Sequence, residues 1–306
     1  WTPASRWTRK SAWLRWASNC ALEELSAVRR QAIAALADAG VPSPGVDADL
    51  LLCHVLGIDR AQLKLRELRG DGLQPAHREQ FTELVAARRT RIPLQHLTGV
   101  AYFRYLELEV GPGVFTPRPE TETVVQLGLD FLAAHGIGSP RCIDLCSGSG
   151  AIAAALASEV PAARVWAVEL SEDAIGYTRA NCEPHGVTVL HQDATQLPAQ
   201  LDGTMDLVIS NPPYIPPNAV PREVEVREHD PEMALYGLGE DGLQVPRAVT
   251  AQALKLLRPG GWYVMEHAEV QRESAAAMLR EAGFTQVAGH QDLTGRARAT
   301  SGYAPQ

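Results

Sequence analysis

The sequence of 306 residues lacks a long apolar run and contains few cysteines. A membrane-spanning helix needs about 18 or more consecutive apolar residues, and the nearest candidate, Leu50 to Val55, is interrupted by His54. The five cysteines are an odd number and form no Cys-x-x-Cys pair, which excludes a complete disulfide framework and a zinc ribbon. We therefore expect a soluble protein of the reducing cytoplasm, with no membrane contact.

The chain also lacks the residue spacings of a metal site. Its nine histidines include no His-x-x-x-His pair, and the one His-x-x-Glu spacing, from His229 to Glu232, contains Pro231. A helix that places two ligands on one face does not run through such a proline. We expect no bound metal.

Positive charge is scarce in the larger part of the chain. Residues 101–306 hold 26 acidic and 14 basic side chains, whereas residues 22–91 hold ten of each. A large acidic surface repels phosphate backbones and attracts cationic small molecules. We expect no direct binding of nucleic acid.

The first 21 residues differ in composition from everything that follows. They hold four tryptophans and four basic residues but no acidic residue. This composition is typical of an organellar transit peptide, and it also fits an extension upstream of the natural start or a cloning remnant. We expect residues 1–21 to be a disordered or non-native extension without a part in the function.

Helical periodicity of apolar residues marks the next segment. One pattern begins at Leu22 and stops at Gly40, and two further patterns surround Leu51 and Phe81. These patterns predict a small helical bundle over residues 22–91, which suits substrate docking better than an active site. Residues 92–119 are expected to be a linker.

The expected linker contains a β-hairpin signal. Apolar and polar residues alternate over residues 101–110, and Gly111-Pro112-Gly113 then forms a turn signal. We predict a β-hairpin in this segment.

Residues 120–306 alternate between strand and helix patterns. Helices such as residues 151–159 and 172–181 separate short apolar runs, which indicates an α/β fold with a doubly wound, mostly parallel sheet of Rossmann-like type. The strands are expected at residues 142–145, 165–168, 187–190, 207–210 and 262–266.

Ligands bind outside the carboxyl ends of the strands in such a sheet. The first expected strand leads into Gly148 and Gly150, which permit close approach of backbone to a ligand at a helix N-terminus. The third glycine of the dinucleotide fingerprint is replaced by Ala153. The loop alone is also compatible with a tight strand-to-helix connection.

Acidic residues follow the second and third expected strands. Glu169 lies 19 residues after Gly150, the spacing of an acid that accepts hydrogen bonds from the ribose of an adenosine ligand. Asp193 is suited to the exocyclic amine of an adenine. Each acid alone is also compatible with a helix N-cap.

The fourth expected strand ends in Asn211-Pro212-Pro213-Tyr214, here called the proline turn. Two prolines fix the backbone and remove two N–H donors, so the turn presents carbonyl acceptors. Asn211 adds a side-chain carbonyl, and Tyr214 adds a flat ring. This combination suits a planar nitrogen that carries two hydrogens, as in an amide or a base amine.

With these motifs the sequence resembles the class I methyltransferases that use S-adenosylmethionine. Within this class it bears a closer resemblance to the release factor glutamine methyltransferases, the HemK/PrmC family, and this resemblance covers about residues 22–301. DNA adenine and RNA guanine methyltransferases resemble the chain only in the proline turn. The resemblance rests on Leu97-Thr98-Gly99 with Phe103, Phe115 to Glu122, Asp144 to Gly150, Ser210 to Ile215, Asp230-Pro231 with Ala234-Leu235, Gly239 to Leu243, Pro259-Gly260-Gly261 and Asp292 to Arg296.

The resemblance implies methyl transfer from S-adenosylmethionine to the glutamine amide in the Gly-Gly-Gln motif of peptide release factors, by a monomer. Asn211, Pro212 and Tyr214 would be catalytic, and these three with Pro213 would bind the substrate amide. The residues expected to bind the cofactor are Cys146, Ser147, Gly148, Ser149, Gly150, Glu169, Asp193, Ala194 and Asn211. Ala194 and Ala268 depart from the family pattern and leave the packing of the adenine open.

Two other functions remain open from the sequence. Methylation of an exocyclic base amine in nucleic acid would require a basic recognition surface. A sensor that binds the cofactor without turnover would not need the proline turn. The acidic run from Glu223 to Glu232 is either a solvated face or a lid. Arg118 either pairs with a carboxylate of its own block, residues 117–122, or touches the ligand.

Overall fold

The computed structural model describes residues 23–306, so the expectation for residues 1–21 lies outside the described part of the chain. Contacts divide the chain into two units, the first ending at Thr98 and the second beginning at Gly99.

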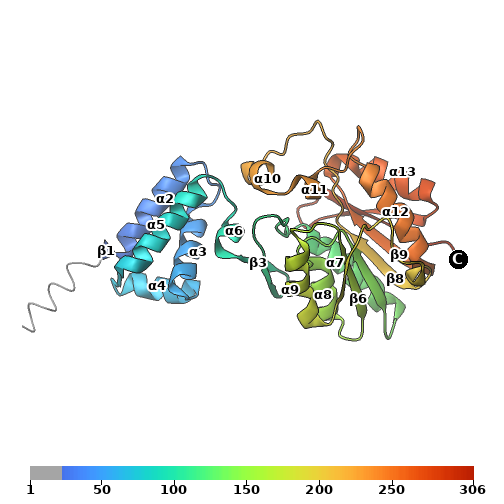
Figure 1. The fold of residues 1–306 in the computed structure, drawn as a ribbon, viewed down its shortest axis with the longest axis horizontal. Helices are drawn as coiled ribbons and strands as arrows, with labels where there is room; N and C mark the ends of the chain where they lie inside the picture. The colour runs from blue at the N-terminus through green and yellow to red at the C-terminus, as the bar shows by residue number, and fades with distance from the viewer. Residues whose placement is uncertain (1–22) are drawn as a thin grey trace, which may run out of the picture. The chain divides into compact units, whose positions relative to one another are not determined.

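The first unit is a bundle of helices (Figure 1). Proline opens two of its helices, at Pro44 and Pro75, and Asp59 caps a third by accepting the backbone N–H of Gln62. The elements are β1 (Glu23–Glu24), α2 (Leu25–Asp38), α3 (Pro44–Leu56), α4 (Arg60–Leu68), β2 (Gly72–Leu73), α5 (Pro75–Arg89) and α6 (Leu94–Thr98).

The apolar positions of the helical pattern form the core of this first unit. Leu36, Leu51 and Phe81 come from three different helices and are almost completely buried together. The predicted bundle is therefore present as a packed unit. It extends beyond Arg91, because α6 also belongs to it.

The second unit contains a seven-stranded sheet in the order β10-β11-β9-β8-β5-β6-β7. The strands from β9 to β7 in this order run parallel, and β11 is antiparallel to both of its neighbours. The predicted doubly wound, mostly parallel fold is confirmed. The strands are β5 (Arg141–Leu145), β6 (Arg164–Glu169), β7 (Thr188–His191), β8 (Met205–Ser210), β9 (Leu257–Glu266), β10 (Thr285–Gln291) and β11 (Ala297–Tyr303).

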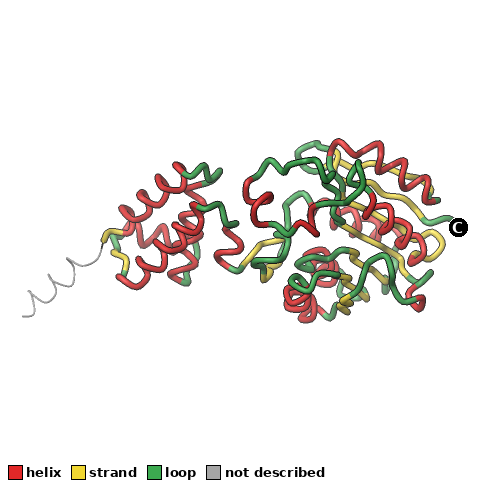
Figure 2. The backbone as a smooth tube through the Cα atoms, turned by 45° about the horizontal axis from the view of Figure 1, so that its top comes forward, coloured by secondary structure: helices red, strands yellow, loops and turns green. Residues whose placement is uncertain are grey.

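Helices cover both faces of this sheet (Figure 2). Successive residues of β8 point to opposite faces, so Leu207 and Ile209 pack in one core cluster and Val208 in the other. This explains why the predicted strands are continuous apolar runs. The helices are α7 (Thr121–His135), α8 (Ala151–Glu159), α9 (Ile175–Cys182), α10 (Val224–His229), α11 (Glu232–Leu235), α12 (Gln244–Leu256) and α13 (Arg272–Ala282), with 3₁₀ turns η1 (Glu183–His185), η2 (Ala199–Leu201) and η3 (Glu269–Gln271).

The chain between the bundle and the sheet differs from its prediction. A hairpin is present, formed by β3 (Val100–Phe103) and β4 (Leu106–Glu109), but it turns at Arg104 and Tyr105 rather than at Gly111 to Gly113. Arg104 adopts a left-handed φ of 51°. The contacts assign the hairpin to the second unit, so residues 92–119 are not a separate linker.

Candidate active site

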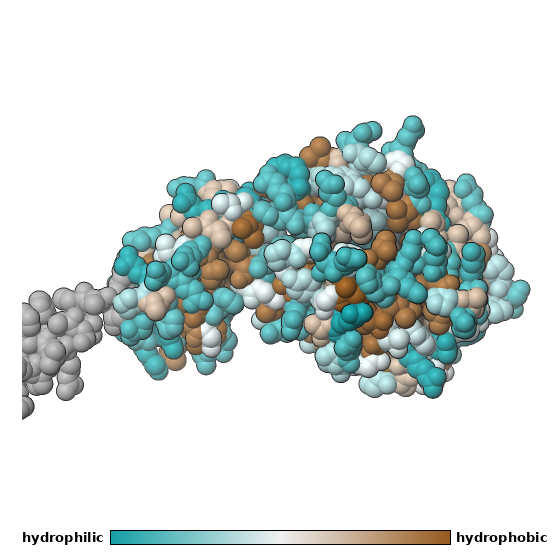
Figure 3. All heavy atoms as spheres, in the orientation of Figure 1, coloured by the Kyte–Doolittle hydropathy of each residue, from teal (hydrophilic) through white to brown (hydrophobic). Residues whose placement is uncertain are grey.

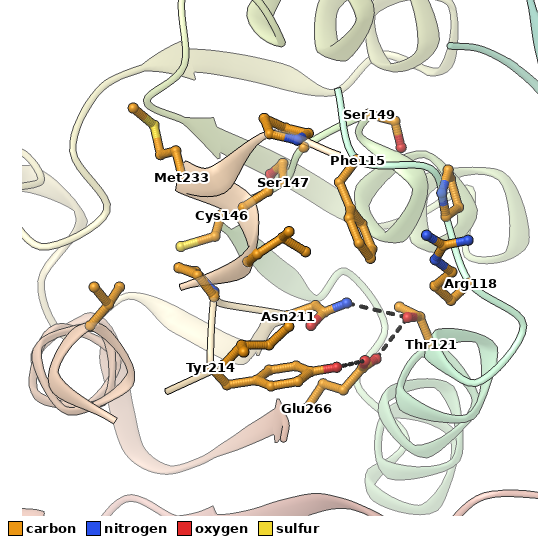
Figure 4. Close-up of a pocket in the computed structure, with 18 of the residues that line it drawn as sticks. Phe115, Arg118, Thr121, Cys146, Ser147, Ser149, Asn211, Tyr214, Met233 and Glu266 are labelled. Carbon is orange, nitrogen blue, oxygen red and sulfur yellow. Dashed lines mark hydrogen bonds between the residues drawn. The ribbon is translucent and has the colours of Figure 1, made fainter. Parts of the chain in front are cut away.

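A large pocket opens at the carboxyl ends of the parallel strands, entirely within the second unit. Its volume is about 1490 Å³, more than the roughly 300–1,000 Å³ of a typical small-molecule pocket. The pocket therefore has room for a cofactor and for a side chain of a second reactant. Its wall includes residues that follow β5, β6, β7 and β8, together with Glu266, the last residue of β9 (Figure 4).

The segment after β5, residues 146–150, forms the first wall and is called the glycine-rich loop. Cys146 holds a left-handed φ of 64° although it is not glycine, a conformation that persists only where the surroundings impose it. A Cβ on Gly150 would lie 2.5 Å from Cys182 Sγ. Gly150 is thus required for packing against α9 and does not itself line the pocket, whereas the other four residues of the loop do.

Glu169, the last residue of β6, holds the glycine-rich loop in place. Its two carboxylate oxygens accept the backbone N–H groups of Gly148, at 2.6 Å, and Ser171, at 2.7 Å. Burial raises the pKa of this carboxyl, and the N–H donors partly oppose the rise. Each oxygen keeps a second lone pair for a ligand hydroxyl, and the residue lines the pocket.

Asp193 lies beyond the end of β7 and also lines the pocket. Its Oδ1 accepts both the backbone N–H and the hydroxyl of Thr195. Its Oδ2 receives only a long contact of 3.5 Å from Gln196. The carboxylate is thus oriented by its own loop and presents Oδ2 as an acceptor.

The proline turn begins at the buried end of β8. Asn211, Pro213 and Tyr214 line the pocket, whereas Pro212 is buried and is not among the lining residues. Among residues 23–306, none donates a hydrogen bond to Asn211 Oδ1 or to the Pro212 carbonyl oxygen. The turn therefore keeps two acceptors unpaired, as two consecutive prolines predict.

Other segments hold the proline turn from behind. Gln271 donates from Nε2 to the carbonyl oxygens of Tyr214, at 2.8 Å, and Asp241, at 2.9 Å. Gly242 packs so closely that a Cβ there would lie 2.4 Å from the Tyr214 carbonyl oxygen. The backbone of the turn is consequently fixed on two sides.

Two residues of this site, Thr121 and Glu266, were missed by the sequence reasoning. Asn211 Nδ2 donates to Thr121 Oγ1 at 3.3 Å, and Thr121 Oγ1 donates to Glu266 Oε2 at 2.7 Å. Tyr214 donates its hydroxyl to the other carboxylate oxygen of Glu266 at 3.1 Å. Figure 4 shows these three contacts as one chain across the pocket floor. Two signals were available: Glu266 ends the fifth expected strand, and Thr121 lies in the block from Phe115 to Glu122 that carries the family resemblance.

Arg118 pairs with a carboxylate that is distant in sequence, so the predicted pairing within its own block is wrong. Arg118 also lines the pocket, and its contact with a ligand stays a prediction. Its Nη2 lies 2.7 Å from Asp230 Oδ2, and its guanidinium stacks on Phe115. Burial raises the pKa of Asp230 to about 6, although Arg118 opposes the rise.

The acidic run from Glu223 to Glu232 is not simply a solvated face. Glu223 and Glu232 line the pocket, and Asp230 is buried.

Known proteins with similar sequences share both units of this chain. The PrmC N-terminal domain family matches residues 27–99, and the methyltransferase domain family matches residues 142–225. A release factor glutamine methyltransferase of Streptomyces coelicolor is 49% identical over 88% of this chain and 94% of its own length. The chain belongs to the release factor glutamine methyltransferase family. A second family member, from Bifidobacterium longum, is 46% identical over 88% of this chain and 95% of its own length.

A further relative lies outside the release factor glutamine methyltransferases. The 4-amino-L-phenylalanine/4-methylamino-L-phenylalanine methyltransferase of Streptomyces pristinaespiralis is 41% identical over 67% of this chain and 70% of its own length. Its match is shorter than those of the release factor glutamine methyltransferases.

S-Adenosylmethionine is the cofactor of this methyltransferase family, and the pocket residues fit it. The oriented carboxylates of Glu169 and Asp193 offer acceptors that suit ribose hydroxyls and an adenine amine. The acidic wall also suits a cationic sulfonium. Of the nine residues predicted to bind the cofactor, all except Gly150 line the pocket.

Proposed function

We propose that this chain methylates the side-chain amide nitrogen of the glutamine in the Gly-Gly-Gln motif of peptide release factors. The observation that carries the proposal is the pair of unpaired acceptors, Asn211 Oδ1 and the Pro212 carbonyl, in a turn held against the cofactor pocket. An amide NH₂ is planar and has two donors to satisfy both. Family membership supports the same substrate.

The site contributes mainly orientation. An amide nitrogen is a weak nucleophile because its lone pair is delocalised into the carbonyl. When Asn211 and Pro212 accept its two N–H groups, the face of the nitrogen is directed toward the cofactor side of the pocket. Fixed geometry of this kind accounts for roughly 7–11 kcal/mol of a reaction barrier in favourable cases.

The cofactor supplies an electrophilic methyl group on a sulfonium. As the nitrogen gains positive charge, the carbonyl dipoles of Asn211 and Pro212 stabilise it. Tyr214 packs against the amide plane. No histidine or lysine lines the pocket among the described residues, so the departing proton passes to water.

The other pocket residues would hold the cofactor. Glu169 accepts the ribose hydroxyls, Asp193 accepts the adenine amine, and Cys146, Ser147, Gly148, Ser149 and Ala194 supply the surrounding wall. Gly150 acts through the packing that shapes the loop.

The helical unit would recruit the protein substrate. A pocket that binds only one glutamine side chain does not distinguish that glutamine from other exposed glutamines. Selectivity for one protein substrate therefore requires a second binding surface. The unit over residues 23–98 contributes no residue to the pocket. Its balanced charge repels an acidic partner less than the acidic second unit does.

Apolar side chains at the pocket wall favour a macromolecular substrate. Met233, Leu238 and Leu293 line the pocket and are 60%, 49% and fully exposed, respectively. Figure 3 shows hydrophobic residues interspersed among hydrophilic ones on the face of the molecule that it draws.

We infer that the protein is a monomer and that it acts in the cytoplasm, where translation takes place. Among residues 23–306, no helix is long and apolar enough to cross a bilayer.

The direct test is methylation of an intact release factor. The protein and S-adenosylmethionine are incubated with the factor, and the digest is searched by mass spectrometry for one added methyl on the Gly-Gly-Gln peptide. A factor with asparagine in place of that glutamine is the control. Parallel reactions use adenine-containing DNA, guanine-containing RNA and 4-amino-L-phenylalanine. Methylation of one of these and not of the factor would overturn the proposal.

A further inference from the structure

The orientation of the Asn211 side chain decides whether the proline turn accepts or repels an amide. A side-chain amide has a carbonyl on one side and an NH₂ group on the other, and a rotation by 180° exchanges them. With the NH₂ group toward the substrate, two donors would face each other. The proposed function therefore requires something that fixes this rotation.

The neighbours of Asn211 supply such a constraint. Glu266 is 2% exposed, and each of its oxygens accepts one hydroxyl, from Thr121 at 2.7 Å and from Tyr214 at 3.1 Å. An ionised carboxylate only accepts hydrogen bonds. The single hydrogen of the Thr121 hydroxyl is thus committed to Glu266.

The remaining lone pairs of Thr121 Oγ1 accept and do not donate. The group of Asn211 that faces Thr121, at 3.3 Å, must consequently be its NH₂ group. The carbonyl oxygen of the same amide is then turned away from Thr121, as Figure 4 shows. This is the oxygen to which no residue in the described range 23–306 donates a hydrogen bond.

We propose that Thr121 and Glu266 are positioning residues that fix the Asn211 amide with its carbonyl toward the substrate. The proposal rests on the proposed function, because it assigns these residues to the same methyl transfer. Neither residue touches the reacting atoms; Glu266 acts through Thr121, and Thr121 acts through Asn211.

The charges around Glu266 keep it an acceptor at neutral pH. Burial raises its pKa to about 6, while the hydroxyl of Thr121, the positive charge of Arg298 and the hydroxyl of Tyr214 lower it, and Glu120 raises it further. At pH 7.5, above this pKa, the carboxyl is mainly ionised. It therefore cannot donate to Thr121 and release the Thr121 hydrogen toward Asn211.

The test compares two substitutions of Thr121. Thr121→Val keeps the shape but removes the hydroxyl, and Thr121→Ser keeps the hydroxyl. We expect kcat on the release factor to fall about tenfold or more in Thr121→Val, since a donor replaces an acceptor at the substrate. In Thr121→Ser, kcat should return to within about threefold of wild type. The Kd for S-adenosylmethionine, measured by calorimetry, should not change in either.

A second variant addresses the other residue of the chain. Glu266→Gln preserves size, but its amide can donate to Thr121, which frees the Thr121 hydrogen to hold Asn211 in the reversed orientation. We expect kcat to fall about as far as in Thr121→Val, with the melting temperature of the cofactor complex retained within a few degrees.

Three results separate the alternatives. If Thr121→Val and Glu266→Gln both keep the wild-type kcat, the positioning proposal is wrong. If Thr121→Ser is as slow as Thr121→Val, the methyl group rather than the hydroxyl matters, and the proposal is also wrong. If the wild-type protein itself does not methylate the factor in the same assay, the proposed function fails instead.

Discussion

A buried ion pair of the helical unit and the pocket residues of the second unit bury polar groups in different ways. In the helical unit, the buried Asp47 and Arg88 pair with each other at 2.7 Å, and Arg88 also donates to the Ile92 carbonyl. In the second unit, Glu169 and Asn211 are fixed by hydrogen bonds on one side and keep acceptors toward the pocket on the other. Buried polar groups that pair with each other stabilise the unit that contains them. Buried polar groups that keep unpaired hydrogen-bond acceptors toward a pocket, here called half-satisfied groups, indicate a ligand.

This difference predicts opposite responses to substitution. Changes at the half-satisfied groups should affect binding or catalysis with little effect on stability. Changes at the closed pair of the helical unit should affect stability with little effect on the pocket.

The largest effect is expected for Asn211→Ala. Removing one preorganised electrostatic partner of a transition state costs roughly 10²–10³-fold in kcat, and Asn211 also orients the nucleophile. Transfer to the release factor should fall at least that far, while the Kd for S-adenosylmethionine stays within about threefold. Asn218→Ala, at an exposed position outside the pocket wall, is the matched control. Equal losses of binding and transfer would contradict the substrate role.

Asp47→Asn should instead destabilise the helical unit. It leaves the buried Arg88 guanidinium without its counter-charge, which costs about 3–5 kcal/mol. Hydrogen exchange in peptides from α3 and α5 should accelerate, and cofactor binding should not change. Asp49→Asn removes a more exposed partner, of Arg29, and should cost about 1 kcal/mol or less. Equal effects of the two variants would show that the Asp47 pair is not closed to solvent.

Glu169→Ala is expected to weaken cofactor binding. A charge-assisted hydrogen bond contributes about 1.5–3 kcal/mol, so the Kd should rise about 10–100-fold, and loosening of Gly148 adds to this loss. Calorimetry with S-adenosylmethionine measures it, with the exposed neighbour Glu172→Ala as control. An unchanged Kd would show that Glu169 supports the glycine-rich loop but does not bind the cofactor.

Asp144→Asn should have a small effect whose sign depends on pH. Asp144 is fully buried, and burial raises its pKa to about 7, from about 4 in an unfolded chain. Between these values only the folded state keeps the proton, so wild-type stability from this group is highest at low pH and lost as pH rises through 7.

The Asp144→Asn variant lacks this loss because its amide does not ionise. The difference in melting temperature, variant minus wild type, should therefore be larger at pH 8 than at pH 5, by about 2 °C or more. The measurement is calorimetry without cofactor. A difference that is the same at both pH values would show that Asp144 does not titrate in this range.

The sequence predicted the sheet and part of the pocket, because apolar runs mark the strands and the residues at the strand ends face the pocket. The apolar runs of β5 and β8 are buried on both faces, so their positions predicted the sheet and placed the glycine-rich loop and the proline turn at one edge. The positions of Glu169 and Asp193 at the carboxyl ends of their strands also predicted that both would face the pocket, and both line it. These features depend on neighbours that are close in the chain.

Features that depend on distant partners could not be predicted. Thr121 and Glu266 are 145 residues apart, and Arg118 and Asp230 are 112 apart. The hairpin turn at Arg104 has no glycine or asparagine signal; its left-handed backbone is held by contacts with Glu122 and Glu159. In each case tertiary contacts, not local propensity, determine the structure.

The division of labour between the units is tested most directly by removing the first one. The chain beginning at Gly99 and the full chain are compared for kcat/KM on an intact release factor and on a short Gly-Gly-Gln peptide, after calorimetry has shown that both bind S-adenosylmethionine. The account predicts a loss of about 100-fold or more on the intact factor for the shortened chain, and a change of less than about threefold on the peptide. A shortened chain that binds the cofactor and methylates the intact factor at the full rate would contradict it.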